Sequence, residues 1–251
     1  FYFAVTMFFT LLLFLTSVVF GSFAGNQFDP IINGTPAIIK KFPYYAVLSR
    51  DRRSISCGGG IIKSNIILTA AHCLDDANFY VYTGIESLND LSRKEPYPVR
   101  TVFKHPRYNG RTNFDIGLVI LSSHIKLDST AQVIPIATSF PDIGSKVTIV
   151  GFGRVECDPL NVDDFGRCIG GYSGILRFAT AKLTGQNNGV IKTVSYNEQN
   201  TCFGDSGGPV IHRNKVVGVV SSGQYSNCRG YDLQTSAVRY YRWLKRYMSI
   251  Y

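Results

Sequence analysis

The sequence predicts an all-β protein, either a barrel or a sandwich, with one helix at its C-terminal end. After residue 30 the chain consists of short apolar runs that are broken by turn residues, as is typical of β-strands. Helical periodicity of any length appears only over 237–251, so the alternation of strands and helices that a parallel sheet needs is absent. The 251 residues are 45% hydrophobic, which is enough for one large domain or two fused small ones.

Six segments have the apolar, β-branched composition of strands and are bounded by turn residues. They are 44–49, 59–70, 79–84, 116–121, 146–153 and 209–223. The last of these contains Asn214-Lys215, where we expect a hairpin turn between two strands. If the domain divides into two lobes, the polar stretch within 122–135 marks the boundary.

The N-terminal segment predicts export from the cell. Residues 1–20 carry no charge and contain the apolar run Met7–Phe20, which small residues at Ser22 and Ala24 follow. This pattern is typical of a secretory signal peptide over residues 1–24, and it places the mature protein outside the cell. An uncleaved membrane anchor is the alternative, since the first 20 residues are just long enough to span a bilayer. The signal peptide is favoured because the small-residue site follows so closely.

Charge and cysteine content restrict the partners and the compartment. The formal net charge is +9, but the basic residues are scattered and no run reaches five, which favours an ordinary solvated surface. The six cysteines form an even set, which suits three disulfides in an oxidising compartment. No CxxC spacing is present, so we expect no metal and no cofactor.

The glycine-rich stretch around Ser206 allows three interpretations: a simple turn, the nucleophile elbow of an α/β-hydrolase, or another kind of serine nucleophile. The hydrolase order is Ser, Asp, His, yet the only histidine after Ser206 is His212, which lies in the next predicted strand. His72 follows an apolar strand and Asp115 begins one, so a base and an orienting carboxylate both precede the serine. This order excludes the elbow and favours a nucleophile.

From Ile31 onward the chain resembles the chymotrypsin/trypsin family of serine endopeptidases. The resemblance implies two six-stranded antiparallel β-barrels with a C-terminal helix and an active site between the barrels. It also implies a short propeptide over 25–30 and a peptidase domain over 31–251. The motifs that carry it are IING (31–34), CGG…LTAAHC (57–73), DIGLVIL (115–121) and CFGDSGGP (202–209).

The resemblance implies a role for each residue that matches a family motif. Ser206 is expected to be the nucleophile, His72 the general base and then acid, and Asp115 the carboxylate that orients it. The backbone N–H groups of Gly204 and Ser206 are expected to form the oxyanion hole. Asp205 is expected to receive the α-ammonium group that cleavage would create at Ile31 (a buried ion pair).

The segment before Ile31 departs from the family pattern. Pro30 precedes Ile31, and residues 1–30 contain no Lys or Arg, so activation after a basic residue is excluded. The alternative to an active secreted endopeptidase is therefore a zymogen-locked or catalytically silent relative that acts as a binding or regulatory module. Asn33 begins the glycosylation sequon Asn33-Gly34-Thr35, two residues from the expected new N-terminus.

The resemblance also implies disulfide pairs and a primary specificity pocket. Asn200 stands where trypsins carry the acidic floor of the pocket, but Asp232 falls on the opposite wall and could pair with a substrate Arg or Lys. One gap in the alignment would replace Asp232 by Leu233 and leave a pocket for an apolar or aromatic side chain; basic specificity is slightly favoured. Ser222 replaces the tryptophan that is usual on this wall. The pocket residues are expected to be Asn200, Thr201, Ser221, Gly223 and Asp232.

The implied disulfides are Cys57–Cys73, Cys202–Cys228 and, from the remaining pair, Cys157–Cys168, for which two free thiols are the alternative.

The predicted partners follow from these assignments. We expect protein or peptide substrates and protein inhibitors of proteases, and we expect no nucleic acid. A membrane partner is expected only if the leader is not cleaved. The enzyme is expected to be a monomer.

Overall fold

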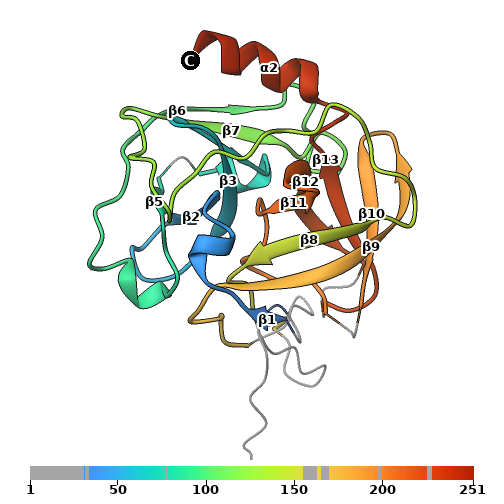
Figure 1. The fold of residues 1–251 in the computed structure, drawn as a ribbon, viewed down its shortest axis with the longest axis horizontal. Helices are drawn as coiled ribbons and strands as arrows, with labels where there is room; N and C mark the ends of the chain where they lie inside the picture. The colour runs from blue at the N-terminus through green and yellow to red at the C-terminus, as the bar shows by residue number, and fades with distance from the viewer. Residues whose placement is uncertain are drawn as a thin grey trace, which may run out of the picture.

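A computed structural model describes residues 31, 34–76, 78–154, 163–164, 170–196, 199–224 and 228–251. It confirms the all-β class: two antiparallel sheets curve into barrels that lie side by side, with one helix on the outside (Figure 1). The predicted signal peptide and propeptide, the sequon at Asn33 and the predicted Cys157–Cys168 disulfide lie outside the described residues.

The first sheet has six strands in the order β5–β2–β3–β4–β7–β6. All residues of β2, β4 and β7 are buried, which explains their continuous apolar sequences. The isolated bridge between Val81 and Tyr97 brings the two edges of the sheet together. The strands are β2 (Tyr45–Ser49), β3 (Cys57–Lys63), β4 (Ile66–Thr69), β5 (Tyr80–Thr83), β6 (Val99–Lys104) and β7 (Gly117–Leu121).

The second sheet runs in the order β1–β9–β10–β13–β12–β11–β8, and pairing between β8 and β9 closes six of its strands into a barrel. The short strand β1 adds to the outside of β9, where Thr35 pairs with Phe178. Residues 35–36 therefore belong to the second sheet, although the strands that follow them in the sequence form the first. The strands are β1 (Thr35–Pro36), β8 (Lys146–Gly151), β9 (Arg177–Asn187), β10 (Val190–Ser195), β11 (Pro209–His212), β12 (Lys215–Gly223) and β13 (Asp232–Ser236).

Two hairpins differ from the sequence prediction. The turn expected at Asn214-Lys215 lies one residue earlier: Arg213 and Asn214 have φ values of 47° and 57°, as a type I′ turn requires, and Lys215 begins β12. The hairpin of β9 and β10 was not predicted. It turns at Asn188-Gly189, where both residues again have positive φ.

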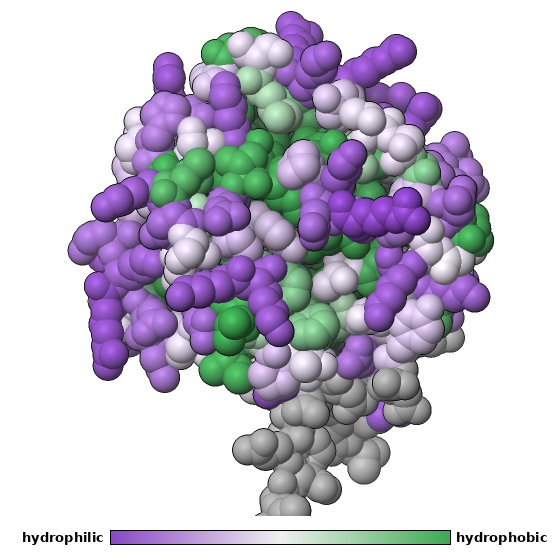
Figure 2. Space-filling view, viewed as in Figure 1, coloured by the Kyte–Doolittle hydropathy of each residue, from purple (hydrophilic) through white to green (hydrophobic). Residues whose placement is uncertain are grey.

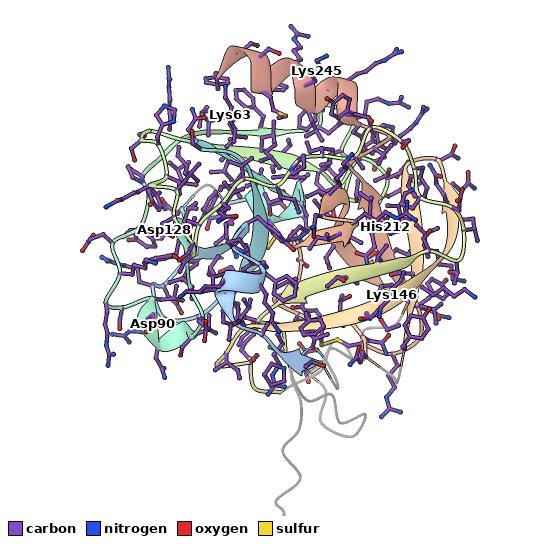
Figure 3. The ribbon with its side chains drawn as sticks, in the orientation of Figure 1. Lys63, Asp90, Asp128, Lys146, His212 and Lys245 are labelled. Carbon is purple, nitrogen blue, oxygen red and sulfur yellow. A yellow bond between two sulfur atoms is a disulfide. The ribbon has the colours of Figure 1, made fainter. Side chains whose placement is uncertain are left out.

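The C-terminal helix α2 (Tyr241–Ile250) packs against the first barrel, although the strands just before it belong to the second (Figure 1). Leu244 is fully buried, and the ring of Tyr247 lies 4.4 Å from that of Phe103 on β6. Lys63, which lies below the helix in Figure 3, donates from Nζ to the carbonyl of Met248 at 3.0 Å. Among the described residues, no helix combines the length and the hydrophobicity that crossing a membrane requires.

One apolar cluster joins the two barrels. It contains Tyr45 and Ile66 from the first sheet and Val150 and Val219 from the second, all buried. The ring of Tyr45 lies 5.9 Å from that of Phe152, which follows β8. The barrels therefore share a packed interface, and the loops at its rim are held in fixed positions relative to one another.

Candidate active site

The three expected catalytic residues come from loops of both barrels and border one cleft. His72 begins a 3₁₀ helix (His72–Leu74) after β4, Asp115 lies two residues before β7, and Ser206 lies in the turn before β11. All three line a cleft of about 450 Å³. The structure thus brings together residues that are 134 positions apart in the sequence, from 72 to 206.

Asp115 is the centre of the hydrogen-bond network in this cleft. Its side chain is almost fully buried, and Oδ2 lies 2.7 Å from His72 Nδ1. Oδ1 accepts from the backbone N–H of His72 at 2.9 Å, and Oδ2 also accepts from the hydroxyl of Ser221 at 2.6 Å. Since a carboxylate only accepts hydrogen bonds, this arrangement places a proton on Nδ1 and leaves Nε2 free to act as a base. The sequence did not predict the bond from Ser221.

The backbone turn at Phe114 orients Asp115. Phe114 has φ of 71°, which is rare for a large side chain. Its ring stacks on His105 at 4.9 Å, and the guanidinium of Arg107 lies 4.3 Å from its centre. These contacts hold the turn, so the carboxylate that follows points toward His72.

The turn that carries Ser206 contains the two backbone N–H groups that are expected to form the oxyanion hole. The carbonyl of Phe203 accepts from the backbone N–H of Arg154 at 2.9 Å. In a trans peptide the N–H points opposite to the carbonyl, so the N–H of Gly204 faces away from Arg154. Gly204 has φ of 100°, a conformation that glycine adopts without strain. Within the described part of the chain, neither the Gly204 nor the Ser206 N–H has a hydrogen-bond acceptor, which leaves both available to a ligand.

Asp205 is fully buried behind this turn. Its Oδ1 accepts from the N–H of Gly153 at 2.8 Å, and its Oδ2 from the N–H of Cys202 at 3.0 Å. A side chain at Gly151 or Gly153 would overlap the carboxyl group, so these glycines create its space. Burial raises the pKa of Asp205 to about 7, and the nearby Asp232 also raises it. A buried carboxyl group in this position would be stabilised by a cation.

Ile31 lies three residues before a contact between the N-terminal segment and the second barrel. Its side chain is fully buried, and three residues later the carbonyl of Gly34 accepts from Arg177 Nη1 at 3.0 Å. Arg177 pairs across the sheet with Gly151, which lies directly against the Asp205 carboxyl group. These contacts place Gly34 on the second barrel, and the pairing of Ile31 with Asp205 stays a prediction.

Comparison with known proteins identifies the family of this fold and site. The sequence model of the Trypsin family matches residues 31–244, most of the chain. The chain belongs to the trypsin family. It is 30% identical to trypsin alpha-4 of Lucilia cuprina over 227 residues, which cover 83% of this chain and 84% of that protein. It is 33% identical to serine protease SP24D of Anopheles gambiae over 210 residues, which cover 76% of this chain and 70% of that protein. The structure of mouse brain neuropsin, a serine protease, superposes with a TM-score of 0.75 at 25% identity, over 86% of this chain and 99% of that one.

Two of the three disulfides expected for this trypsin-family chain fall within the described residues, and both are formed. Cys57–Cys73 joins β3 to the helix that begins at His72. Cys202–Cys228 ties the turn before Ser206 to the segment before β13. The only group of possible metal ligands among the described residues is His72 with Cys57 and Cys73, and the disulfide occupies both sulfur atoms.

The expected specificity residues of this trypsin-family member divide into two groups. Thr201, Ser221 and Gly223 line the cleft. Asn200 and Asp232 are not among the residues that line it: they are 8% and 2% exposed, and Asp232 Oδ2 accepts from the N–H of Thr201 at 3.3 Å. Burial raises the pKa of Asp232 to about 7. Thr201 lines the cleft, and the carboxyl group of Asp232 contacts Thr201 from the side away from the cleft.

A cross-barrel contact that the sequence did not predict involves Ser222. Its hydroxyl is hydrogen-bonded to that of Thr112 at 2.8 Å, and the carbonyl of Thr112 accepts from Thr235 Oγ1 at 2.7 Å. Thr112 comes from the loop before Asp115, so these bonds tie that loop to the wall of the second barrel.

Proposed function

We propose that this chain is a secreted serine endopeptidase that cleaves peptide bonds through Ser206, His72 and Asp115. The observation that carries the proposal is the 2.7 Å contact between Asp115 Oδ2 and His72 Nδ1 in a cleft that Ser206 also lines. Membership of a family of serine proteases supports the same chemistry. The substrates are proteins or peptides, and protein inhibitors of proteases are further partners of a monomeric enzyme.

The proposed reaction has two stages with an acyl-enzyme between them. His72 Nε2 takes the hydroxyl proton as Ser206 Oγ attacks the substrate carbonyl, and the imidazolium then protonates the leaving amine. The N–H groups of Gly204 and Ser206 donate to the oxyanion, each contributing about 3 kcal/mol to transition-state stabilisation. A water molecule then hydrolyses the acyl-enzyme by the same steps, with His72 again the base.

Maturation is part of the proposal. Residues 1–24 are removed as a signal peptide, and cleavage after Pro30 releases the propeptide 25–30. The new ammonium group of Ile31 then pairs with the Asp205 carboxylate. The burial of Asp205 and its raised pKa support this step, because a cation would stabilise a carboxylate that burial otherwise disfavours.

A serine-directed phosphonate tests the proposal. The chain produced from Ile31 with a free N-terminus should form a covalent adduct at Ser206 that mass spectrometry locates. The Ser206→Ala variant is the control and should remain unlabelled. A folded sample without an adduct would contradict the endopeptidase and favour the catalytically silent alternative. Labelling of the 31–251 chain but not of 25–251 would show that the propeptide locks the enzyme.

We propose further that Asp232 directs cleavage after Arg or Lys. A side chain that enters beside Thr201 reaches the wall behind which the carboxyl group lies, and a guanidinium or ammonium group would pair with it once it is ionised. The Asp232→Asn variant should lower kcat/KM for Arg and Lys substrates about 100-fold, since a hydrogen bond between charged groups contributes up to about 3 kcal/mol.

A peptide library cleaved by both forms measures this change. The variant Asp142→Asn removes an exposed carboxylate and serves as the control, which should leave the profile unchanged. Since burial raises the pKa of Asp232 to about 7, the preference for basic residues should strengthen as pH rises through 7. A preference for aromatic or apolar residues that Asp232→Asn leaves unchanged would contradict the assignment.

A further inference from the structure

Two segments supply most of the net positive charge of the chain. Residues 96–114 and 233–251 each contain four Lys or Arg and no Asp or Glu. Together they supply +8 of the formal net charge of +9, so the rest of the chain is nearly neutral. The basic residues are scattered along the sequence, but the excess of basic over acidic residues lies almost entirely in these two segments.

The fold packs these two segments against each other. Besides the contact between Phe103 and Tyr247, the ring of His105 lies 5.1 Å from that of Trp243 and 4.9 Å from that of Tyr240. Aromatic side chains thus form the inner layer, and the basic side chains remain on the outside. The two segments make one surface, which we call the basic surface.

A cavity of about 560 Å³ lies within the basic surface. The side chains of Arg107, Arg239 and Arg242 line it, and no carboxylate does. All three residues are exposed, and none forms an ion pair with any residue that the structure describes. Burial and the charge of Arg107 lower the pKa of His105, which also borders the cavity. Three cations therefore share a space without a partner of opposite charge.

The basic surface continues along the outer face of α2. Arg242, Lys245 and Arg246 follow the i, i+3, i+4 spacing of one helix face, and all are exposed. Hydrophilic side chains project from this part of the molecule in Figure 2, and Figure 3 marks Lys245 on the helix. Cations extend from the cavity along the helix, a pattern that fits an elongated anion better than a single small one.

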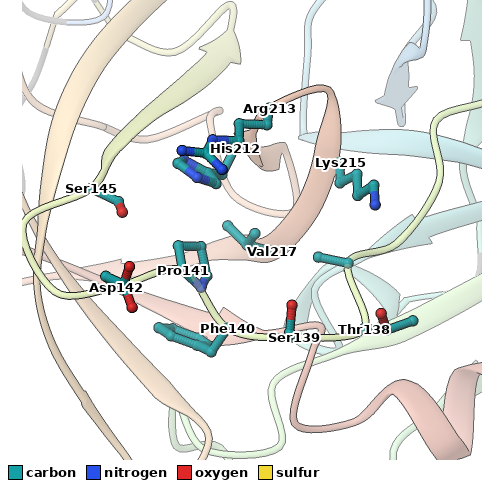
Figure 4. A pocket seen from close by; sticks show the side chains of 11 residues that line it. Thr138, Ser139, Phe140, Pro141, Asp142, Ser145, His212, Arg213, Lys215 and Val217 are labelled. Atoms are coloured by element: carbon teal, nitrogen blue, oxygen red, sulfur yellow. The ribbon is translucent and has the colours of Figure 1, made fainter.

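A second cavity, of about 260 Å³, is also lined by basic side chains but differs from the first because a carboxylate lines it too. Arg213 and Lys215 border it, but so does Asp142, which lies across the cavity from His212 and Arg213 (Figure 4). The mixed charge there makes it a poor anion site and a suitable source of control substitutions.

We propose that the basic surface binds a sulfated polysaccharide, with one sulfate group in the cavity between Arg107, Arg239 and Arg242. The planar guanidinium group donates two parallel hydrogen bonds, which match the oxygens of a sulfate. A single-stranded nucleic acid would need free aromatic faces for base stacking. Here Trp243 is packed between His105 and Tyr247, and Arg107 covers Phe114. The proposal does not depend on peptidase activity.

Calorimetric titration tests the proposal. The Ser206→Ala form of 25–251 is titrated with a heparin octasaccharide at about 0.15 M NaCl. We expect binding that is lost with the desulfated octasaccharide. The triple variant R107Q/R239Q/R242Q should weaken binding about 100-fold, because several charge-assisted hydrogen bonds are lost. The single variant R242Q, on an exposed helix face, should weaken it about tenfold and guards against misfolding of the triple variant.

The control variant R53Q/R93Q/R213Q removes the same number of charges from exposed positions outside the basic surface. It should weaken binding by about threefold or less, as expected for distant, screened charges. An equal loss in the two triple variants would overturn the proposal, because binding would then follow net charge alone. Absence of binding, or tighter binding of a DNA oligonucleotide of equal charge, would overturn it as well.

Discussion

Replacing Asp115 by asparagine is expected to lower kcat by about 10⁴-fold, the effect seen when the carboxylate of a Ser-His-Asp protease becomes an amide. An amide can donate to His72 Nδ1, which would move the imidazole proton to Nε2. The ring could then no longer accept the proton of Ser206. The amide has only one oxygen, whereas the Asp115 carboxylate accepts three hydrogen bonds through its two oxygens.

Steady-state kinetics of the chain 31–251 measure this effect, with KM expected to stay nearly constant. Ser221→Ala is a matched control, because it removes one donor to Asp115 and leaves the carboxylate in place. It should lower kcat by about tenfold or less, as expected for one hydrogen bond. If Asp115→Asn retains activity within about tenfold of the parent, Asp115 does not orient the base.

The stability of the precursor and of the mature chain should respond to pH in opposite ways. In the uncut chain, burial raises the pKa of Asp205 from its usual 3.8 to about 7. The folded state then binds a proton more tightly than the unfolded state does. Its stability should be highest below about pH 4, should fall by about 4 kcal/mol between about pH 4 and pH 7, and should level off above pH 7.

Cleavage before Ile31 should reverse this trend, because an ammonium partner lowers the pKa of Asp205. Urea unfolding of Ser206→Ala forms of 25–251 and 31–251, at several values between about pH 4 and 8, measures the difference. The variant Asp205→Asn of 25–251 should show a smaller pH dependence, with the remainder coming from Asp232. Parallel curves for the two chains would mean that Ile31 does not pair with Asp205.

The parts of the fold that sequence analysis predicted are those with uninterrupted apolar strands. The strand β7 is buried along its whole length and carries five apolar or glycine residues in a row. By contrast, β9 alternates buried residues such as Ala179 and Ala181 with more exposed ones such as Lys182, so its composition resembles that of a loop. The Asn188-Gly189 dipeptide was the local evidence for this hairpin, since both residues adopt positive φ readily.

The candidate site shows a similar limit. The order of His72, Asp115 and Ser206 indicated the chemistry, because it depends only on residue types along the chain. The hydroxyl of Ser221 on Asp115 joins positions 106 residues apart, and the bond between Arg154 and Phe203 joins two backbone groups. Neither contact depends on a local pattern, so only the folded arrangement reveals it.

Each barrel supplies an element to the other: β1 adds to the second sheet, and α2 packs on the first. The bond from Lys63 to Met248 spans 185 residues, and that from Asn65 to Tyr251 spans 186. The first barrel therefore cannot cover its apolar surface until α2 has been synthesised. The two barrels should unfold in a single cooperative transition, and during biosynthesis the first barrel should depend on chaperones until the C-terminal segment leaves the ribosome.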